Sequence, residues 1–261
     1  MKTLNNVEAL LRETDPSQIA ELFAEADTVR RENIGDAVHF RALIELSNRC
    51  TRSCGYCGLR VENNALTRYE MTDEEILDSL QKALALDYHT VVLQAGECPS
   101  LSCERITNLV RKIKELAPIA VTLSLGEQPQ ATYEAWREAG ADRYLLRFET
   151  SNPQLYSAIH PHAANAEEHP RIAPLRQLQE LGYEVGSGML VGIPSQTYRD
   201  LAADILLLQE LQLDMIGLGP FLVHPATPLA TPESCGLQNA GAEQVPASLV
   251  LHVSAPWVRT L

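Results

Sequence analysis

Apolar residues in this chain fall into short continuous runs that alternate with amphipathic segments. Six runs contain too few polar positions for strands with one face in water, so they predict strands buried on both faces. These runs cover residues 40–46, 89–96, 119–126, 142–150, 183–193 and 214–223. Strands of this kind belong to parallel sheets that helices cover, and the alternation therefore predicts an α/β fold.

The segments between the runs begin with recognisable helix signals. Thr72 and Glu75 match a capping box ahead of one amphipathic segment. Two helices should also open the chain, and Asp15 followed by Pro16 provides the N-cap and the first residue of the second. The later strands are thus followed by helices, as in a series of βα units.

Six βα units in strict alternation predict a TIM-like barrel with its chemistry at the C-terminal ends of the strands. About six units are expected, with the last two units of a full barrel missing. A doubly wound open sheet is the alternative, although no βα turn has the glycine spacing of a dinucleotide site. The expected organisation is N-terminal helices at 1–35, the barrel at 36–230 and an atypical tail at 231–261, where the alternation is lost.

Charge and hydropathy limit the partners of the protein. The chain of 261 residues has 34 acidic and 21 basic side chains, which gives a formal net charge of −13. A surface of that sign disfavours nucleic acid and anionic membranes as partners. No stretch has the apolar length of a signal-peptide core or a membrane span. We therefore expect a cytoplasmic protein, in which clustered cysteines serve as metal or redox ligands rather than as disulfides.

Three cysteines follow the first predicted strand at the spacing C-x₃-C-x₂-C: Cys50, Cys54 and Cys57. Structural zinc would need a fourth ligand, and the histidines of the chain are scattered. A pair of buried thiols with one bystander is the simplest alternative. The spacing also suits three corners of a [4Fe–4S] cube, which would leave the fourth iron open to a small molecule.

The same motif, with Tyr56 before its last cysteine, resembles that of the radical S-adenosylmethionine (SAM) enzymes. In that superfamily the amino and carboxylate groups of SAM chelate the open iron, and reduction cleaves SAM to methionine and a 5′-deoxyadenosyl radical. Within it the chain resembles the HydE family, the maturases of [FeFe]-hydrogenase, with biotin synthase and methylornithine synthase as relatives. The resemblance runs from about residue 26 to about residue 229 and is most specific at "WREAGADRYLLRFET".

This resemblance implies roles for individual residues around SAM. The three cysteines match the cluster ligands, and Tyr56 matches an aromatic residue near the adenine. Gly96 and Glu97 occupy the positions at which members of the family contact the methionyl amino group of SAM. Glu149 matches an acidic residue that contacts SAM, and Arg171 matches a basic residue that would pair with the methionyl carboxylate.

Substrate-side positions are implied for Gln94, Thr122 and Arg147, which should point from strand ends toward the barrel interior. Simpler roles remain open for each. Gln94 could satisfy a backbone group, and Thr122 could be a β-branched core residue. Arg147 and Glu149 could form a buried ion pair without a ligand, and Arg171 could be a surface charge on a helix.

The implied function is assembly of the di-iron subcluster of [FeFe]-hydrogenase. The substrate would be a cysteine-bound iron complex with carbonyl and cyanide ligands, and the electron donor a ferredoxin or flavodoxin; other hydrogenase maturases are further expected partners. The alternatives are a radical SAM mutase or synthase of the methylornithine or biotin synthase type, and a catalytically impaired fragment that binds SAM or the cluster. Cys98 and Cys103 are interpreted as ordinary thiols, and Cys235 has no assigned role.

Overall fold

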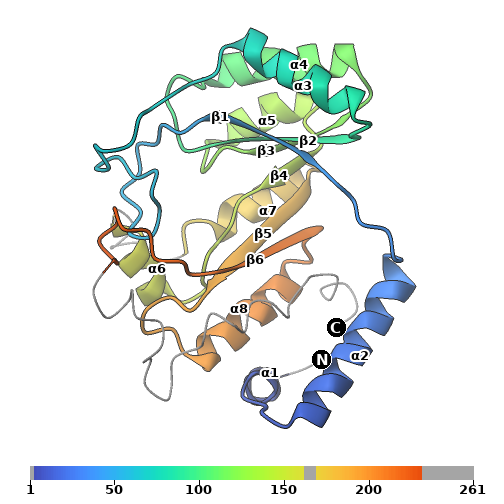
Figure 1. The fold of residues 1–261 in the computed structure, drawn as a ribbon, viewed down its shortest axis with the longest axis vertical. Helices are drawn as coiled ribbons and strands as arrows, with labels where there is room; N and C mark the ends of the chain where they lie inside the picture. The colour runs from blue at the N-terminus through green and yellow to red at the C-terminus, as the bar shows by residue number, and fades with distance from the viewer. Residues whose placement is uncertain (1–2, 162–168, 231–261) are drawn as a thin grey trace.

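The computed structural model of the chain describes residues 3–161 and 169–230, and its centre is one parallel sheet. The strands follow one another in the order β1 to β6, and every neighbouring pair is parallel (Figure 1). They are β1 Ala42–Ser47, β2 Thr90–Ala95, β3 Ala120–Ser124, β4 Arg143–Leu145, β5 Glu184–Val191 and β6 Met215–Pro220. All six predicted strands are therefore present, although β4 is much shorter than its apolar run.

Eight helices are present in the described residues. They are α1 Leu4–Leu11, α2 Pro16–Asn33, α3 Asp73–Ala85, α4 Cys103–Leu116, α5 Gln130–Glu138, α6 Pro153–Ile159, α7 Ile172–Glu180 and α8 Tyr198–Glu210. Asp15 caps α2 ahead of Pro16, and Thr72 and Glu75 form the predicted capping box at α3. None of these helices is long and apolar enough to cross a membrane.

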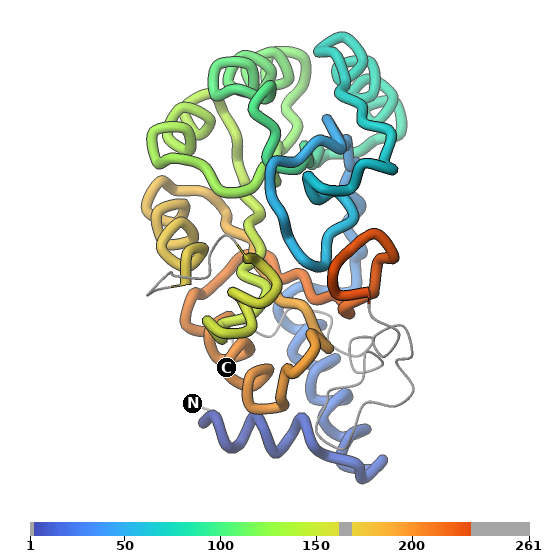
Figure 2. The backbone as a smooth tube through the Cα atoms, turned by 90° about the vertical axis from the view of Figure 1, so that its left-hand side faces the viewer, coloured from blue at the N-terminus to red at the C-terminus, as the bar shows by residue number. Residues whose placement is uncertain are grey.

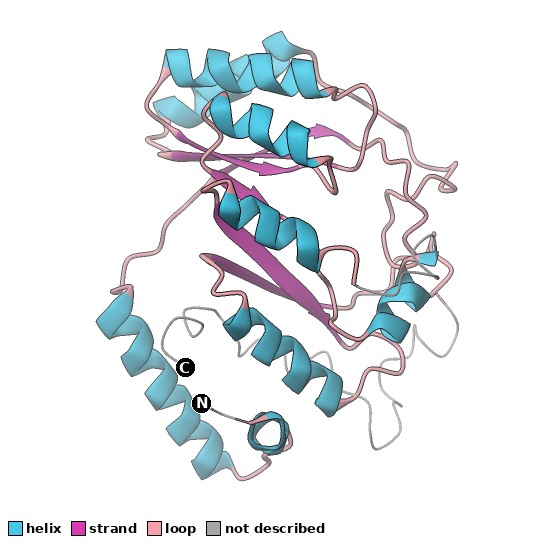
Figure 3. Cartoon of the chain, turned by 180° about the vertical axis from the view of Figure 1, so that it is seen from behind, coloured by secondary structure: helices cyan, strands magenta, loops and turns pink. Residues whose placement is uncertain are grey.

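The helices that alternate with the strands lie on one side of the curved sheet (Figure 3). Successive units follow an arc, so that the colours of Figure 2 pass in chain order around it. A doubly wound sheet would instead have helices on both faces and a strand order that reverses. The structure therefore confirms a partial TIM-like barrel. The predicted tail, 231–261, lies outside the described residues.

The hydrophobic core lies between the outer face of the sheet and the covering helices. Leu93 of β2 and Val121 of β3 belong to this core, in the same buried cluster as Leu109 of α4 and Trp136 of α5. Because side chains alternate along a strand, their neighbours point to the inner face. On the edge strand β1 that inner face includes Leu43, which is 56% exposed. The prediction that the strands are buried on both faces is therefore wrong for β1, since no described residue covers this side chain.

Strand β4 ends earlier than predicted because a side chain replaces part of the β4–β5 ladder. The Ser187 hydroxyl donates to the carbonyl oxygen of Leu146 at 2.7 Å and accepts from the N–H of Phe148 at 3.2 Å. Pairing then resumes at a single bridge between Glu149 and Met189. Glu149 itself has φ +68°, in the left-handed region that non-glycine residues seldom adopt. Such conformations gather at functional sites, where the surroundings enforce them.

Asp204 of α8 fastens the segment that follows Glu149. Its Oδ1 accepts hydrogen bonds from the N–H and the hydroxyl of Ser151, while its Oδ2 is buried without a partner in the described part of the chain. Burial raises the pKa of Asp204 to about 7, although the Ser151 hydrogen bonds oppose the shift. The folded protein therefore holds a proton on this carboxyl group that the unfolded chain releases at lower pH.

We expect Asp204→Asn to change how stability depends on pH. Between the unfolded and folded pKa values the native state binds more protons, so the free energy of unfolding of the parent falls as pH rises. The free energy of unfolding of the variant, relative to that of the parent, should therefore rise by about 2 to 3 kcal/mol from pH 5 to pH 8. Urea unfolding at both pH values measures this difference. Asp78→Asn, in an exposed ion pair of α3, is the matched control, and a gain no larger than its own would contradict the assignment.

Candidate active site

The loop after β1 carries the three cysteines to the C-terminal edge of the sheet, on the left in Figure 1. Two backbone hydrogen bonds fasten it there: Thr51 donates to the carbonyl oxygen of Glu97 at 3.0 Å, and Gly55 donates to that of Ile159 at 2.7 Å. The first bond joins the loop to the end of β2, and the second joins it to the end of α6. The cysteines are thus held where the chemistry of a parallel α/β fold is found.

Cys54 is buried, whereas Cys50 and Cys57 are partly buried. Burial raises the pKa of Cys54 to about 12 and also raises that of Cys57, so these thiols are protonated without a metal. In the described residues no group of three His, Cys, Asp or Glu side chains converges on one point where a metal ion could sit. In a [4Fe–4S] cube irons and sulfides alternate at the corners and each cysteine thiolate binds its own iron, so the three thiolates need not converge on one ion. Three thiols on one short loop, one buried and two partly buried, are a donor set that fits such a cube.

The end of β2 approaches this loop so closely that a side chain is excluded. A Cβ on Gly96 would lie 2.6 Å from the Cβ of Cys50 and 3.1 Å from its Sγ. Glycine therefore allows the strand end and the first cysteine to meet. This contact places Gly96 beside the cysteine loop.

Glu149 is 4% exposed and lies against the loop and two arginines. Its Oε1 accepts a hydrogen bond from the Tyr56 hydroxyl at 3.2 Å, and its Oε2 lies 3.5 Å from Nη2 of Arg147. Burial raises the pKa of Glu149, and the charges of Arg147 and Arg171 oppose this shift. The Tyr56 hydroxyl also lies 3.4 Å from Nε2 of His160, so it is held from two sides.

Arg171 is buried at the start of α7, with 8% of its surface exposed, and is therefore not a surface charge. Its Nε donates to Oε1 of Glu127 at 2.8 Å, and its Nη1 donates to the carbonyl oxygen of Arg147 at 2.6 Å. Nη1 also lies 4.0 Å from Oε1 of Glu149. Burial disfavours a charged guanidinium, but neighbours that include Glu127 outweigh it and raise the pKa of Arg171.

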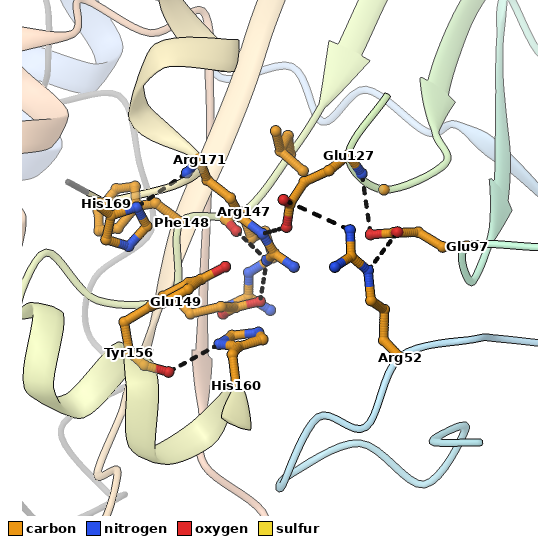
Figure 4. A network of polar contacts seen from close by, with 12 residues as sticks. Arg52, Glu97, Glu127, Arg147, Phe148, Glu149, Tyr156, His160, His169 and Arg171 are labelled. Carbon is orange, nitrogen blue, oxygen red and sulfur yellow. Dashed lines mark hydrogen bonds and ion pairs between the residues drawn. The ribbon is translucent and has the colours of Figure 1, made fainter. Parts of the chain in front are cut away.

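These ion pairs join into a series of alternating charges, which we call the charge chain (Figure 4). In Figure 4 it passes from Glu97 and Arg52 on one side to Arg171 and the end of β4 on the other. Its members, in order, are Glu97, Arg52, Glu127, Arg171, Glu149 and Arg147. The cysteine loop, three strand ends and α7 therefore contribute to one electrostatic unit.

The predicted substrate-side residues lie on the inner face but do not contact one another in a single group. Gln94 donates to Oε1 of Glu45 on β1 at 3.2 Å, so it does not bind a backbone group. Thr122 pairs with Val92 across the β2–β3 ladder, which puts it on the same face as Gln94. Arg147, beyond the end of β4, donates to the carbonyl oxygen of Met189 at 2.6 Å.

Two of these side chains and the neighbouring Glu149 each hold a buried polar atom without a hydrogen-bond partner in the described residues. The atoms are Oγ1 of Thr122, Nε of Arg147 and Oε2 of Glu149. Buried polar groups are nearly always hydrogen-bonded, so such atoms need an explanation. Their location on the inner face and at the end of β4 is what a polar ligand site would require.

Sequence reasoning missed Arg52, Glu127 and His160. A signal existed for Glu127, because the runs that became β2 and β3 both end in Gly-Glu, "AGE" and "LGE". Arg52 lies inside the cysteine motif but has no feature that separates it from a surface charge. His160 contacts the Tyr56 hydroxyl, and its ring stacks on that of Tyr156 with 4.2 Å between the ring centroids. The sequence alone does not indicate the contact with Tyr56, because the two residues are far apart in the chain.

Two further described cysteines are Cys98, which directly follows Glu97, and Cys103 at the start of α4. Sγ of Cys98 is 2.9 Å from the hydroxyl of Ser100, and Sγ of Cys103 is 4.0 Å from that of Thr107 on the same helix. Both are free thiols.

Comparison with known proteins identifies relatives of the chain. The family model of the Radical SAM superfamily matches residues 44–208. The chain is 50% identical to the [FeFe] hydrogenase maturase subunit HydE of Thermotoga maritima over 209 residues, which are 80% of this chain and 59% of that protein. It is 28% identical to 3-methylornithine synthase of Methanosarcina barkeri over 232 residues, which are 87% of this chain and 64% of that enzyme.

Among solved structures, the crystal structure of methylornithine synthase (PylB) matches with a TM-score of 0.80 at 26% identity, over 87% of this chain and 66% of that chain. The chain thus spans less than two thirds of the length of the curated relatives named above. The likeness to HydE, biotin synthase and methylornithine synthase that the motifs predicted is confirmed. The chain therefore belongs to the Radical SAM superfamily, whose members are enzymes that use a [4Fe–4S] cluster and S-adenosylmethionine.

Proposed function

We propose that this chain is the radical SAM core of a maturase that helps to assemble the di-iron subcluster of [FeFe]-hydrogenase. The observation that carries the proposal is the 50% identity to HydE, against 28% to 3-methylornithine synthase. The core occupies residues 36–230, after the N-terminal helices at 1–35. All residues that we assign to the site lie inside this core.

Cys50, Cys54 and Cys57 would hold three irons of the cluster and leave the fourth open to SAM. When bound, the cluster supplies the electron that cleaves SAM to methionine and a 5′-deoxyadenosyl radical. The protein contributes burial and orientation. Cys54 is buried, and two backbone hydrogen bonds fix the loop to the ends of β2 and α6.

Around SAM, the charge chain offers partners for each end of the methionyl group. Arg171 would pair with the carboxylate, since a guanidinium matches the geometry of that group. Gly96 and Glu97 would meet the amino group. Glu97 already accepts from Arg52 and from the N–H of Glu127, but a carboxylate has about four acceptor positions and can receive an ammonium as well. Tyr56 and Glu149 would lie beside the nucleoside.

Gln94, Thr122 and Arg147 would contact the substrate from the inner face. A cysteine-bound iron complex with carbonyl and cyanide ligands offers weak acceptors and a carboxylate, which suits hydroxyl, amide and guanidinium donors. A ferredoxin or flavodoxin would supply the electron, and other hydrogenase maturases would supply or receive the iron complex.

The cluster assignment predicts that only three cysteines matter for iron. After anaerobic reconstitution the parent should hold about four irons per chain, and Ala at position 50, 54 or 57 should remove the cluster and SAM cleavage. Cys98→Ala and Cys103→Ala are matched controls that should retain both. Iron analysis and 5′-deoxyadenosine production measure the outcome, and loss of the cluster from the Cys98 variant would refute the ligand set.

The Glu149 assignment predicts a defect in SAM binding rather than in folding. Glu149→Gln preserves shape but removes the charge between Arg147 and Arg171, so SAM should bind roughly ten- to a hundredfold more weakly with the cluster retained. Equilibrium dialysis of the reconstituted protein measures the affinity. Glu184→Gln removes a carboxylate from an ion pair at the other end of β4 and β5 and should leave SAM affinity unchanged. A Glu149 variant with normal affinity and a lower Tm would indicate a structural ion pair.

The assigned pathway predicts complementation of hydrogenase maturation. We expect a chimera with residues 231–261 replaced by the C-terminal part of the Thermotoga maritima relative to restore hydrogenase activity in cells that lack HydE. The same chimera with Cys57→Ala should remain at background. A chimera that cleaves SAM but leaves hydrogenase inactive would reject the maturase assignment and favour a small-molecule synthase.

A further inference from the structure

Glu127 lies at the middle of the charge chain, between the cysteine loop and Arg171. Its Oε1 accepts from Nε of Arg171 at 2.8 Å, and its Oε2 lies 3.7 Å from Nη2 of Arg52. The side chains of Glu127 and Arg171 are 20% and 10% exposed. Coulomb interactions are stronger and less screened there than at the surface. One carboxylate therefore joins the arginine between the cysteines to the arginine at the start of α7.

The backbone around Glu127 holds this carboxylate in place. Gly126 has φ +75°, and a Cβ there would lie 2.2 Å from Cγ of Glu97, so only glycine allows Glu97 to pack across the turn. The N–H of Glu127 then donates to Oε1 of Glu97 at 3.2 Å, while Oε2 of Glu97 accepts from Nε of Arg52. Arg52 thus connects to Glu127 directly and also through Glu97.

Two of the three nitrogens of the Arg171 guanidinium donate hydrogen bonds to the protein. Nε binds Glu127 and Nη1 binds the carbonyl oxygen of Arg147, whereas Nη2 donates to no acceptor in residues 3–161 and 169–230. Because the guanidinium is planar and rigid, fixing Nε and Nη1 also fixes the directions of the Nη2 donors. Glu127 therefore determines which edge of Arg171 remains for a ligand.

We propose that Glu127 is a positioning residue that orients Arg171 toward the carboxylate of SAM and links this orientation to the seating of the cysteine loop through Arg52. The inference rests on the proposed function, in which Arg171 receives that carboxylate. Glu127 itself touches no part of SAM. Its contribution is therefore to the preference for a ligand with a carboxylate, not to affinity in general.

The test compares SAM with decarboxylated SAM, which lacks only the carboxylate, on the reconstituted full chain. Glu127→Gln should raise the Kd for SAM roughly tenfold, because a charge-assisted bond to Arg171 is weakened. The Kd for decarboxylated SAM should stay within about twofold of the parent, and iron content and the electron paramagnetic resonance spectrum should be unchanged. Glu210→Gln, which removes the carboxylate from the exposed Arg176–Glu210 pair between α7 and α8, should alter neither Kd.

A second variant tests the link to the cysteine loop and is available if Glu127→Gln fails to fold. Arg52→Gln keeps Glu127 but removes its partner in the loop, so the preference for SAM over decarboxylated SAM should fall by a smaller factor. Equal weakening of both ligands by either variant would mean a structural role and overturn the proposal, as would unchanged SAM affinity in both. A parent protein that assembles the cluster but binds no SAM would instead defeat the proposed function.

Discussion

Charges of opposite sign, largely withdrawn from water at one edge of a parallel sheet, decide how the cysteine loop, the strand ends and α7 meet. Removing a charge from water has a large free-energy cost that only a well-placed partner offsets. Arg171 is nearly inaccessible to solvent and is surrounded by Glu127, Glu149 and a backbone carbonyl group. Neighbouring members of the charge chain lie within 4.0 Å of one another, so the ion pairs help to fix the relative positions of segments that are distant in sequence.

The sheet can support this arrangement because its outer face packs in the hydrophobic core, whereas its inner face carries polar side chains. The outer face provides the hydrophobic core with α3, α4, α5, α7 and α8, and this core contains most of the large buried side chains. The inner face can therefore present Gln94, Thr122 and Arg147 without loss of apolar burial, which is the main source of stability. A parallel sheet also brings the C-terminal ends of all its strands to the same edge, which is where the loop delivers the cysteines.

How far the sequence predicts this structure depends on whether the signal is local. β2 and β3 were predicted well because apolar, β-branched runs bounded by turns specify buried strands. The cysteine motif is also local, and resemblance to the HydE family implied roles for Glu149 and Arg171, which the structure places in the charge chain. The early end of β4 could not be predicted, because the Ser187 hydroxyl that interrupts the ladder comes from another strand. Arg52 and Glu127 were missed for the same reason: a charge in a loop resembles a surface charge until its partner is known.

The end of β4 is where the structure departs most from local preference. Glu149 has a left-handed backbone, and Glu149, Arg147 and Thr122 each hold a buried polar atom without a hydrogen-bond partner among the described residues, although Oε2 of Glu149 lies 3.5 Å from Nη2 of Arg147. Strain and unpaired polar groups each lower stability, and they persist only where the surroundings enforce them. Here the surroundings are Ser187 on one side and the Ser151–Asp204 hydrogen bonds on the other. A ligand that supplies the absent partners would bind the folded state alone, and its binding energy would then add to the stability of the fold. In that case the polar groups that weaken the free protein would be the same groups that select the ligand.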